Sequence, residues 1–381
     1  MKKLISAALA AVTLILPLLI LSSCGRQKYD LVLITDTGSV TDKDYNQSAW
    51  TAMTEFAIER NLDCRYFVPS GSDKDALLSQ IRAAADDGAK VIVLPGSLFE
   101  VAANTAQREY PEVKFILIDG KPHPDDTKVE DVLSNTAALL YASEQAGFLA
   151  GYAAVKDGYK KLGFMGGTPD EDTRAYGCGF LQGVKYAADE GGVTAEVTYC
   201  YTDNTDNNDT NKKTAATMYE NGVDVIFTHG GDLEFAVLEA AAEKRSYAIC
   251  SDRDKRHVSS TVLSSAVKGV TASLKLVLRS IYDTKDFEYS FGGKVTYFDA
   301  AHGGAGLASF VINDSNGNAF DRFLKFTRED YEAILQELVS GDITVKRDIT
   351  VYDPAGHATA EELISSLHLD GLTVTVLQGS K

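Results

Sequence analysis

Small polar residues end several apolar segments of strand length in this chain of 381 residues. In open parallel sheets, ligands bind outside the carboxyl ends of the strands. Carboxylates at such positions accept hydrogen bonds, and glycines keep the backbone open to a bound molecule. A single aspartate after a strand is more often a helix cap or a turn residue, so it is the recurrence that predicts a ligand-binding rim. The residues concerned are Asp36, Gly96, Asp119, Gly166, Gly167, Gly230, Gly231 and Asp252.

Sequence motifs of common enzymes are absent. The patterns G-x-x-x-x-G-K-[ST], G-x-S-x-G and H-E-x-x-H do not occur, and "GFMGGTPDED" lacks the G-x-G-x-x-G spacing of a dinucleotide site. Of the six histidines, only His229 ends a strand, and we interpret it as a rim residue rather than a general base. Because no nucleophile accompanies an activating base, the sequence predicts a binding protein without catalytic residues, cofactor or metal.

Composition narrows the class of partner. The formal net charge is −17, which argues against a nucleic-acid-binding role because such proteins need a basic face. Cys64, Cys178, Cys200 and Cys250 lie far apart with no C-x-x-C, a spacing that disfavours zinc. Buried thiols are the expectation, and a disulfide between Cys178 and Cys200 is the alternative.

The N-terminus is typical of an exported protein. Lys2 and Lys3 precede an apolar run over residues 4–21, which predicts a signal peptide over 1–23, although an uncleaved membrane helix has a similar length. The sequence Leu-Ser-Ser-Cys over 21–24 resembles a lipobox, which implies acylation of Cys24 and a lipidated tether over 24–28. Several acyl chains anchor a protein stably, so the expected location is the extracytoplasmic face of the cell membrane.

Apolar segments of strand length alternate with helical patterns along the rest of the chain. Helical patterns occupy 48–61 and 73–88, where apolar residues recur on one face. Continuous apolar strands separated by amphipathic helices predict an α/β fold with parallel sheets covered on both faces. The expected strands are 30–35, 64–69, 90–95, 113–119, 161–167, 195–201, 224–231 and 247–252.

Two lobes are expected from the strand count and from the chain length. The chain is predicted to cross between them near residues 130–135 and to cross back later, with a hinge and a cleft between the lobes. The first lobe is assigned to 29–134 plus about 258–290, the second to 135–257 plus about 291–325, and a C-terminal helix and tail to 326–381.

Several segments of the chain resemble segments of a known protein family. The segment "DTGSVTDKDYNQSAW" over 36–50 resembles D-x-G-x-x-D-D-x-S-F-N-Q-x-A-W/E in the basic membrane protein (Bmp) family of ABC-transporter substrate-binding lipoproteins, which includes purine nucleoside receptors. "EQAGFLAGYAA", "LGFMGG", "GFLQGVKYA" and "ICSDRDK" also have counterparts there, in order, from about residue 30 to about residue 310. The resemblance implies a type I periplasmic binding protein fold, with two Rossmann-like lobes joined by a hinge of three crossings.

The resemblance also implies roles for residues of the first lobe. Asp36, Tyr45 and Asn46 would line the cleft, and Asp119 would hydrogen-bond the base of a nucleoside. The ring of Tyr45 would stack on the base, a contact worth about 1–3 kcal/mol in other aromatic–base pairs. Asn46 offers a donor and an acceptor together.

Residues of the second half are implied to hold the sugar. Asp252 and Lys268 would bind ribose hydroxyls with help from the Gly230–Gly231 backbone. Phe180 is a candidate for a second ring wall, with a place in the core of its helix as the alternative. For Lys268 the alternative is a solvent-facing helix lysine.

The chain departs from the family pattern at three places. Tyr45 stands where the family has Phe, which keeps the ring and adds a hydroxyl. "ICSDRDKR" over 249–256 replaces G-V-D-x-D-Q, so the surroundings of Asp252 are more basic and bulkier. Asp232, Leu233 and Glu234 occupy positions where small residues are expected. These departures make the ribose side of the site the part that differs most from the family.

The combined prediction is a monomeric, lipid-anchored receptor that binds a nucleoside, with purine nucleosides favoured, and delivers it to an ABC permease and its ATPase. A sugar or signal-molecule receptor that feeds a sensor kinase is the alternative, because a fold does not determine a function. A nucleoside hydrolase is a third, weaker hypothesis.

Overall fold

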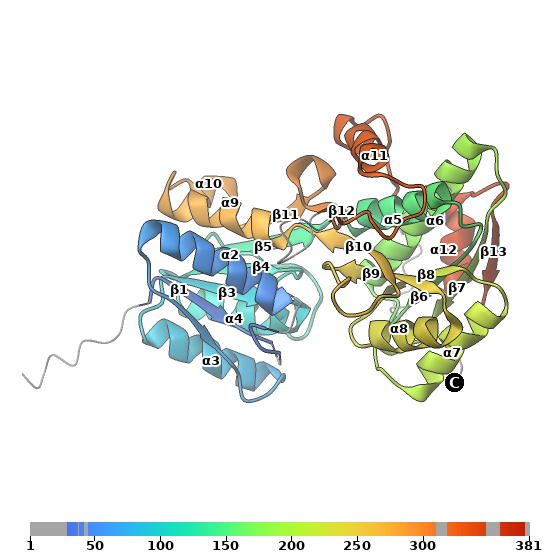
Figure 1. Ribbon diagram of the computed structural model, residues 1–381. Helices are drawn as coiled ribbons and strands as arrows, with labels where there is room; N and C mark the ends of the chain where they lie inside the picture. Colours follow the sequence, from blue (N-terminus) through green and yellow to red (C-terminus); the bar gives the residue numbers. More distant parts are fainter. Residues whose placement is uncertain (1–28, 37, 42–44, 310–317, 348–358, 378–381) are drawn as a thin grey trace, which may run out of the picture.

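Two β-sheets, each between layers of helices, form the two lobes of the computed structural model (Figure 1). The structure describes residues 29–36, 38–41, 45–309, 318–347 and 359–377. The expected signal peptide, Cys24 and the tether lie outside these residues. Among the described residues, none of the helices is long and apolar enough to cross a bilayer. The two sheets confirm the two-lobed α/β fold with parallel strands that the sequence predicts.

The first lobe contains a six-stranded sheet of order β11-β5-β4-β3-β1-β2 whose neighbours all pair in parallel. Its strands are β1 (Leu31–Ile34), β2 (Cys64–Phe67), β3 (Val91–Pro95), β4 (Lys114–Ile118), β5 (Thr136–Tyr141) and β11 (Lys294–Phe298). Helices α2 (Tyr45–Arg60) and α9 (Val270–Tyr282) cover one face, and α3 (Lys74–Asp86) and α4 (Glu100–Glu109) cover the other. The short α10 (Phe287–Ser290) packs beside α9.

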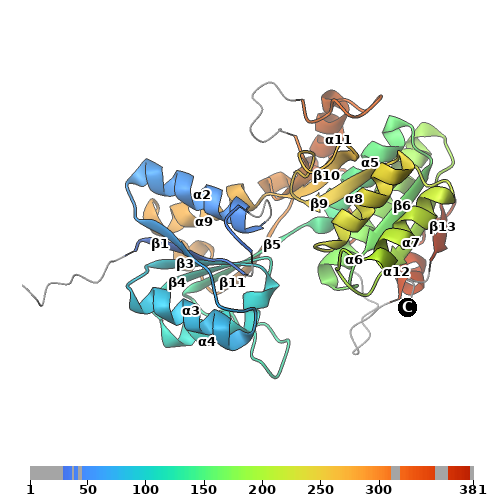
Figure 2. The ribbon, with the colours of Figure 1, turned by 60° about the horizontal axis from the view of Figure 1, so that its bottom comes forward.

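The second lobe contains a seven-stranded sheet of order β12-β10-β9-β8-β6-β7-β13, in which only β12 runs antiparallel to its neighbour. Its strands are β6 (Lys161–Gly166), β7 (Glu196–Tyr201), β8 (Val225–His229), β9 (Tyr247–Asp252), β10 (Val262–Lys268), β12 (Ala305–Leu307) and β13 (Thr373–Val376). Helices α7 (Asp209–Glu220) and α8 (Leu233–Lys244) cover one face, which Figure 2 turns toward the viewer. The other face carries α5 (Ser143–Asp157), α6 (Glu171–Gly191), α11 (Arg328–Ser340) and α12 (Ala360–Leu367).

The sheets correct the lobe boundaries expected from the sequence. β5 pairs with β4, so the first lobe continues to Tyr141 instead of ending at 134. β10 pairs with β9 in the second sheet, although 258–290 was assigned to the first lobe. β11 pairs with β5 in the first sheet, although 291–325 was assigned to the second. Strand patterns do not identify the partner of a strand, and the partner decides which lobe a strand joins.

Three crossings join the lobes in the part of the chain that the structure describes. They follow β5, β10 and β11, and hydrogen bonds tie them together, from Ala142 N to Phe298 O at 3.0 Å and from Gly269 N to Gly304 O at 2.9 Å. A Cβ atom on Gly269 would lie 1.9 Å from the carbonyl oxygen of Gly303. The crossings are thus packed backbone to backbone, as a shared hinge requires.

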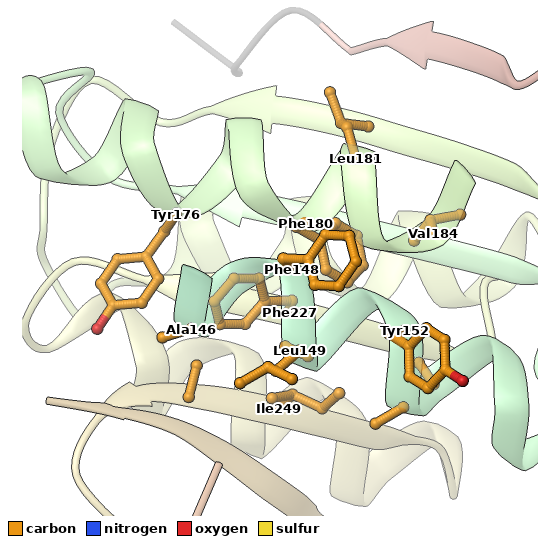
Figure 3. Packing of buried hydrophobic residues seen from close by; sticks show 14 of the residues in the cluster. Ala146, Phe148, Leu149, Tyr152, Tyr176, Phe180, Leu181, Val184, Phe227 and Ile249 are labelled. Carbon is orange, nitrogen blue, oxygen red and sulfur yellow. The ribbon is translucent and has the colours of Figure 1, made fainter. Parts of the chain in front are cut away.

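Helices α5 and α6 also approach through glycines. A Cβ atom on Gly183 would lie 2.0 Å from the carbonyl oxygen of Phe148, and one on Gly179 would lie 1.9 Å from that of Glu144. Figure 3 shows buried side chains of the core around these helices, among them Phe148 of α5 and Phe180 of α6. The close backbone contact brings the amino end of α6, where site residues lie, against the crossing at Ala142.

A Gly183→Ala variant is expected to lower the free energy of unfolding by about 1–3 kcal/mol or more, because the added methyl forces two backbones apart. The matched control is Gly191→Ala in the last turn of the same helix, where the nearest atom to an added Cβ is 3.7 Å away. That variant should gain up to about 1 kcal/mol of helix propensity. Urea denaturation measures both values, and equal stability of the two variants would contradict the expected overlap.

Candidate ligand-binding site

The ammonium group of Lys268 lies at the centre of a polar cluster between the lobes. Its side chain has no solvent exposure, and Nζ lies 2.7 Å from Asp119 Oδ2, 2.6 Å from Asp172 Oδ2 and 3.2 Å from Asp252 Oδ1. Asp119 follows β4 of the first lobe, whereas Asp172 and Asp252 belong to the second. Lys268 ends β10 and is not a helix lysine. The cluster therefore joins residues of both lobes at the carboxyl ends of their strands.

Tyr45, the first residue of α2, reaches the same cluster. Its hydroxyl lies 2.8 Å from Asp119 Oδ2 and 3.0 Å from Asp252 Oδ1, and accepts a hydrogen bond from Lys268 Nζ at 2.8 Å. A hydroxyl carries one hydrogen, so it donates to one of the two carboxylates at a time. Burial and the nearby carboxylates raise the pKa of Tyr45 well above its usual range. The Tyr45 hydroxyl thus stays protonated and bridges the lobes.

Burial and the ammonium group set the ionisation of the cluster. Burial would lower the pKa of Lys268, but Asp119, Asp172 and Asp252 raise it well above the usual range. Burial would raise the pKa of Asp252, but Lys268, His229 and Lys255 hold it below its usual range. For Asp119, burial outweighs the attraction of Lys268 and raises the pKa to about 6. Lys268 is therefore a fixed cation, Asp252 a fixed anion, and Asp119 titrates near neutrality.

The raised pKa of Asp119 gives stability a defined pH dependence. The folded-state pKa of about 6 exceeds the unfolded value of about 3.9, so the folded state binds this proton more tightly. The contribution of Asp119 is most favourable below about pH 4 and is lost as the pH rises through 6. We expect the stability of the wild type relative to Asp119→Asn to fall by up to about 3 kcal/mol from pH 4 to pH 7.

Chemical denaturation at several pH values measures this difference. The control is Asp125→Asn, since Asp125 is a surface residue whose pKa is lowered by its hydrogen bond to Lys74. The stability of the wild type relative to Asp125→Asn should rise slightly with pH, which is the opposite direction. A difference for Asp119→Asn that stays flat or rises with pH would rule out a raised pKa at this position.

Asp36 and Asn46 form a separate pair beside the cluster. Asn46 Nδ2 donates to Asp36 Oδ1 at 2.8 Å, and the Asp36 amide donates to Asn46 Oδ1 at 3.3 Å. The Gly38 amide also donates to Asp36 Oδ1, at 2.6 Å. These bonds hold the turn after β1 and the first turn of α2, which carries Tyr45. In this structure the pair positions the aromatic ring, and direct ligand contacts by Asp36 and Asn46 stay a prediction.

Gly230 and Gly231 form the turn after β8. Their φ angles are 132° and 54°, and a Cβ atom on Gly230 would lie 3.1 Å from the Gly167 backbone. The turn therefore needs glycine for its conformation and for its packing on the loop after β6. Contacts of its backbone with a sugar stay a prediction.

Phe180 does not form a second ring wall, because it lies in the core of the second lobe. Its ring centroid lies 5.3 Å from that of Phe227, and its side chain is fully buried. Figure 3 shows Phe180 among the core side chains, while the hydroxyl of Tyr176 points away from them. Tyr176 lies one helical turn nearer the carboxyl ends of the strands and donates to Asp252 Oδ1 at 3.1 Å. Tyr176 is thus the aromatic residue of α6 that reaches the site.

Two further residues, Asp172 and His229, complete the site. Asp172 lies in the first turn of α6, after the N-cap Asp170, where acids are ordinary helix-capping residues. His229, placed on the rim from the sequence, lies with Nε2 3.4 Å from Asp172 Oδ2 and Nδ1 3.5 Å from Asp252 Oδ2. Three ligand atoms from these residues lie within 4.8 Å of one another and could hold a cation. The Lys268 ammonium already contacts both carboxylates, and the prediction of no metal stays a prediction.

The departures from the family pattern contact one another. Glu234 of α8 forms a buried ion pair with Lys255 of the "ICSDRDKR" segment. The same carboxylate accepts hydrogen bonds from Ser251 N at 2.9 Å and Ser251 Oγ at 2.6 Å. The bulky charged residues expected on the ribose side therefore form an ion pair that also binds Ser251, the residue before Asp252. Cys178 and Cys200 are both free, so the disulfide alternative does not apply in this structure.

Comparisons with known proteins agree with this architecture. A model of the Bmp family, described as "ABC transporter substrate-binding protein PnrA-like", matches residues 30–344. The chain is 26% identical over 321 residues to Basic membrane protein A1 of Borrelia garinii subsp. bavariensis, covering 80% of this chain and 90% of that protein. It is also 26% identical over 337 residues to Basic membrane protein A of Borreliella afzelii, covering 83% and 96%.

A solved structure is similar across both lobes. The solute-binding protein of an ABC transporter system from Aeropyrum pernix shares 21% identity with a TM-score of 0.68, covering 90% of this chain and 99% of that one. This likeness supports the periplasmic binding protein fold. The family match extends over most of the chain, and with the two lobes and the hinge it shows that the chain belongs to the Bmp family of PnrA-like ABC transporter substrate-binding proteins.

Proposed function

We propose that this protein binds a nucleoside between its two lobes, with purine nucleosides as the first candidates, and delivers it to an ABC permease. The observation that carries the proposal is the meeting of Tyr45, Asp119, Asp252 and Lys268 in one buried cluster. These four residues come from distant parts of the sequence, and the family resemblance assigns each of them to the ligand.

The chemistry of the cluster suits a nucleoside. The ring of Tyr45 offers a face for a base to stack on, and Asp119 accepts a hydrogen bond from a base N–H. Asp252 accepts from ribose hydroxyls, and Lys268 donates to them. Ligand hydroxyls would replace the Tyr45 hydroxyl as partners of Asp252 and Lys268. Contacts from both lobes to one ligand would favour the closed arrangement.

The charges of the cluster support a nucleoside over a nucleotide. Asp119, Asp172 and Asp252 surround a single ammonium group. A phosphate group added to the ligand would face this excess of negative charge in a site shielded from solvent. Neutral ligands rich in hydrogen-bond donors fit the same surroundings.

Anchoring and delivery complete the proposal. Acylation at Cys24 would hold the protein at the extracytoplasmic face of the membrane, beside the permease. Cys24 lies outside the residues that the structure describes, so the lipobox-like sequence alone supports this part. Mass spectrometry of the mature N-terminus tests it.

A ligand screen of the soluble chain from residue 25 tests the proposed ligand. A molecule that binds only the native state raises the melting temperature, so nucleosides, nucleotides, free bases and sugars are compared, with calorimetry for each hit. We expect purine nucleosides to stabilise the protein and Tyr45→Ala to lose roughly 10- to 100-fold in affinity, as a lost stacking contact would cause. Tyr289→Ala is the control, because that tyrosine is 84% exposed.

The outcome separates the candidate functions. Stabilisation by a sugar and by no nucleoside would reject the nucleoside and favour the sugar or signal-molecule receptor. Chromatography of the incubated nucleoside would reveal any hydrolysis, the third hypothesis.

A further inference from the structure

A chain of hydrogen bonds leads from the interior of the second lobe to His229. The buried ammonium of Lys255 pairs with Glu234, whose other carboxylate oxygen accepts from Ser251 Oγ at 2.6 Å. Ser251 Oγ in turn lies 2.8 Å from His229 Nδ1. Ser251 has no solvent exposure, and His229 is only 8% exposed. The order of the chain is therefore Lys255, Glu234, Ser251, His229.

This series of hydrogen bonds fixes the position of each hydrogen atom in it. The Glu234 carboxylate is an acceptor only, and its Oε2 atom already pairs with the ammonium of Lys255. Its Oε1 atom takes the hydroxyl hydrogen of Ser251, so Ser251 Oγ is left to accept a hydrogen bond from His229. Nδ1 of His229 must then carry a hydrogen, and in the neutral imidazole Nε2 is unprotonated.

The surroundings of Nε2 need a hydrogen-bond donor. Nε2 faces Asp172 Oδ2 at 3.4 Å, a separation longer than an ordinary N–H···O hydrogen bond. The ring lies against Tyr176, with centroids 4.7 Å apart, which restricts its rotation. Asp172 and Asp252 are acceptors as well, so an unprotonated Nε2 completes a wall of three acceptors. Two adjacent hydroxyl groups could donate to two of them at once.

We propose that Ser251, Glu234 and Lys255 hold His229 in the Nδ1–H tautomer, and that its Nε2 accepts a hydrogen bond from one hydroxyl of the ligand's vicinal diol. Asp172 or Asp252 accepts from the other hydroxyl. This inference rests on the proposed function, because the diol is the one that a ribonucleoside carries. It also gives Glu234 and Lys255, two departures from the family pattern, a single role as positioning residues.

Nuclear magnetic resonance of protein labelled with ¹⁵N-histidine tests the tautomer without any ligand. Long-range ¹H–¹⁵N spectra at pH 8, with a chelator present, distinguish Nδ1–H, Nε2–H and the doubly protonated ring, and His229→Ala assigns the signal. We expect the Nδ1–H pattern in the wild type and a shift toward Nε2–H in Ser251→Ala. A doubly protonated ring or an Nε2–H pattern in the wild type would overturn the proposal.

Calorimetry tests the role in recognition. Inosine is compared with its 2′-deoxy and 3′-deoxy analogues in the wild type, His229→Ala, Ser251→Ala and the surface control His302→Ala, since His302 is exposed. The ratio of the affinity for inosine to that for its deoxy analogues should fall roughly three- to tenfold in His229→Ala and in Ser251→Ala, as for one lost hydrogen bond. It should stay unchanged in His302→Ala. If Ser251→Ala does not fold, Glu234→Leu with Lys255→Met removes the acceptor of the Ser251 hydroxyl, so that Ser251 Oγ can donate to His229 Nδ1 and the Nδ1–H tautomer is no longer fixed.

The two proposals fail in different ways. A wild type that binds no nucleoside overturns the proposed function and the ligand role of His229 together. A wild type that binds inosine, but whose preference for the diol is the same in His229→Ala, overturns only the present inference.

Discussion

A Lys268→Met variant is expected to have a free energy of unfolding lower by at least about 3–5 kcal/mol, because the substitution leaves the carboxylates between the lobes without their cation. Asp119, Asp172 and Asp252 all lie within 3.2 Å of the ammonium that would be removed. The same change removes the donor proposed for the ligand's hydroxyls. We therefore expect nucleoside affinity to fall by 100-fold or more, since a buried charged hydrogen bond contributes up to about 3 kcal/mol.

Denaturation and calorimetry on the same preparation measure both effects. Lowering the pH should return part of the lost stability, because protonation neutralises the uncompensated carboxylates. Lys275→Met is the control, since Lys275 forms a surface pair with Glu55 and such pairs contribute about 0–1 kcal/mol. A Lys268→Met protein with wild-type stability and affinity would mean that the cluster has no energetic role.

A Lys255→Met variant should destabilise the second lobe by about 3–5 kcal/mol, because Glu234 would keep a buried charge without its partner. Removing both charges in Glu234→Gln with Lys255→Met should recover most of this loss, since the amide oxygen of Gln still accepts from Ser251. The thermodynamic cycle formed by the two single variants and the double variant gives the coupling energy.

The control for this cycle is Lys244→Met, because Lys244 forms an exposed ion pair with Glu220 and should cost less than about 1 kcal/mol. A double variant less stable than Lys255→Met alone would show that the Glu234 carboxylate does not need the Lys255 ammonium for its burial. A coupling energy near zero would have the same meaning.

Much of the site could be predicted from residue types at strand ends. Asp119 and Asp252 follow buried strands, and parallel strands bring their carboxyl ends to one edge of a sheet. Tyr45 and Lys268 needed the family resemblance, because a helix tyrosine and a lysine after an apolar run have common structural roles. The structure brings all four together, and their contacts with a ligand stay a prediction.

The remaining features depend on three-dimensional pairing that no local pattern encodes. Phe180 and Tyr176 are aromatic residues one helical turn apart on α6, and their different distances from the edge of the sheet place Phe180 in the core and Tyr176 at the site. Asp172 has the pattern of a capping residue. The partnership of Glu234 with Lys255 depends on how α8 packs over the segment after β9, and each residue alone indicated only a departure.

The strand order has a consequence for how the chain acquires its structure. β11 closes the first sheet by pairing Lys294 with Ala137, and β13 extends the second by pairing Thr373 with Glu196. Both sheets are thus completed by strands distant in sequence, which gives the protein a high contact order and slow folding. During synthesis from the N-terminus, an early portion of the chain cannot finish either sheet. Neither sheet can therefore have its full set of strands until these late parts of the chain have been synthesised.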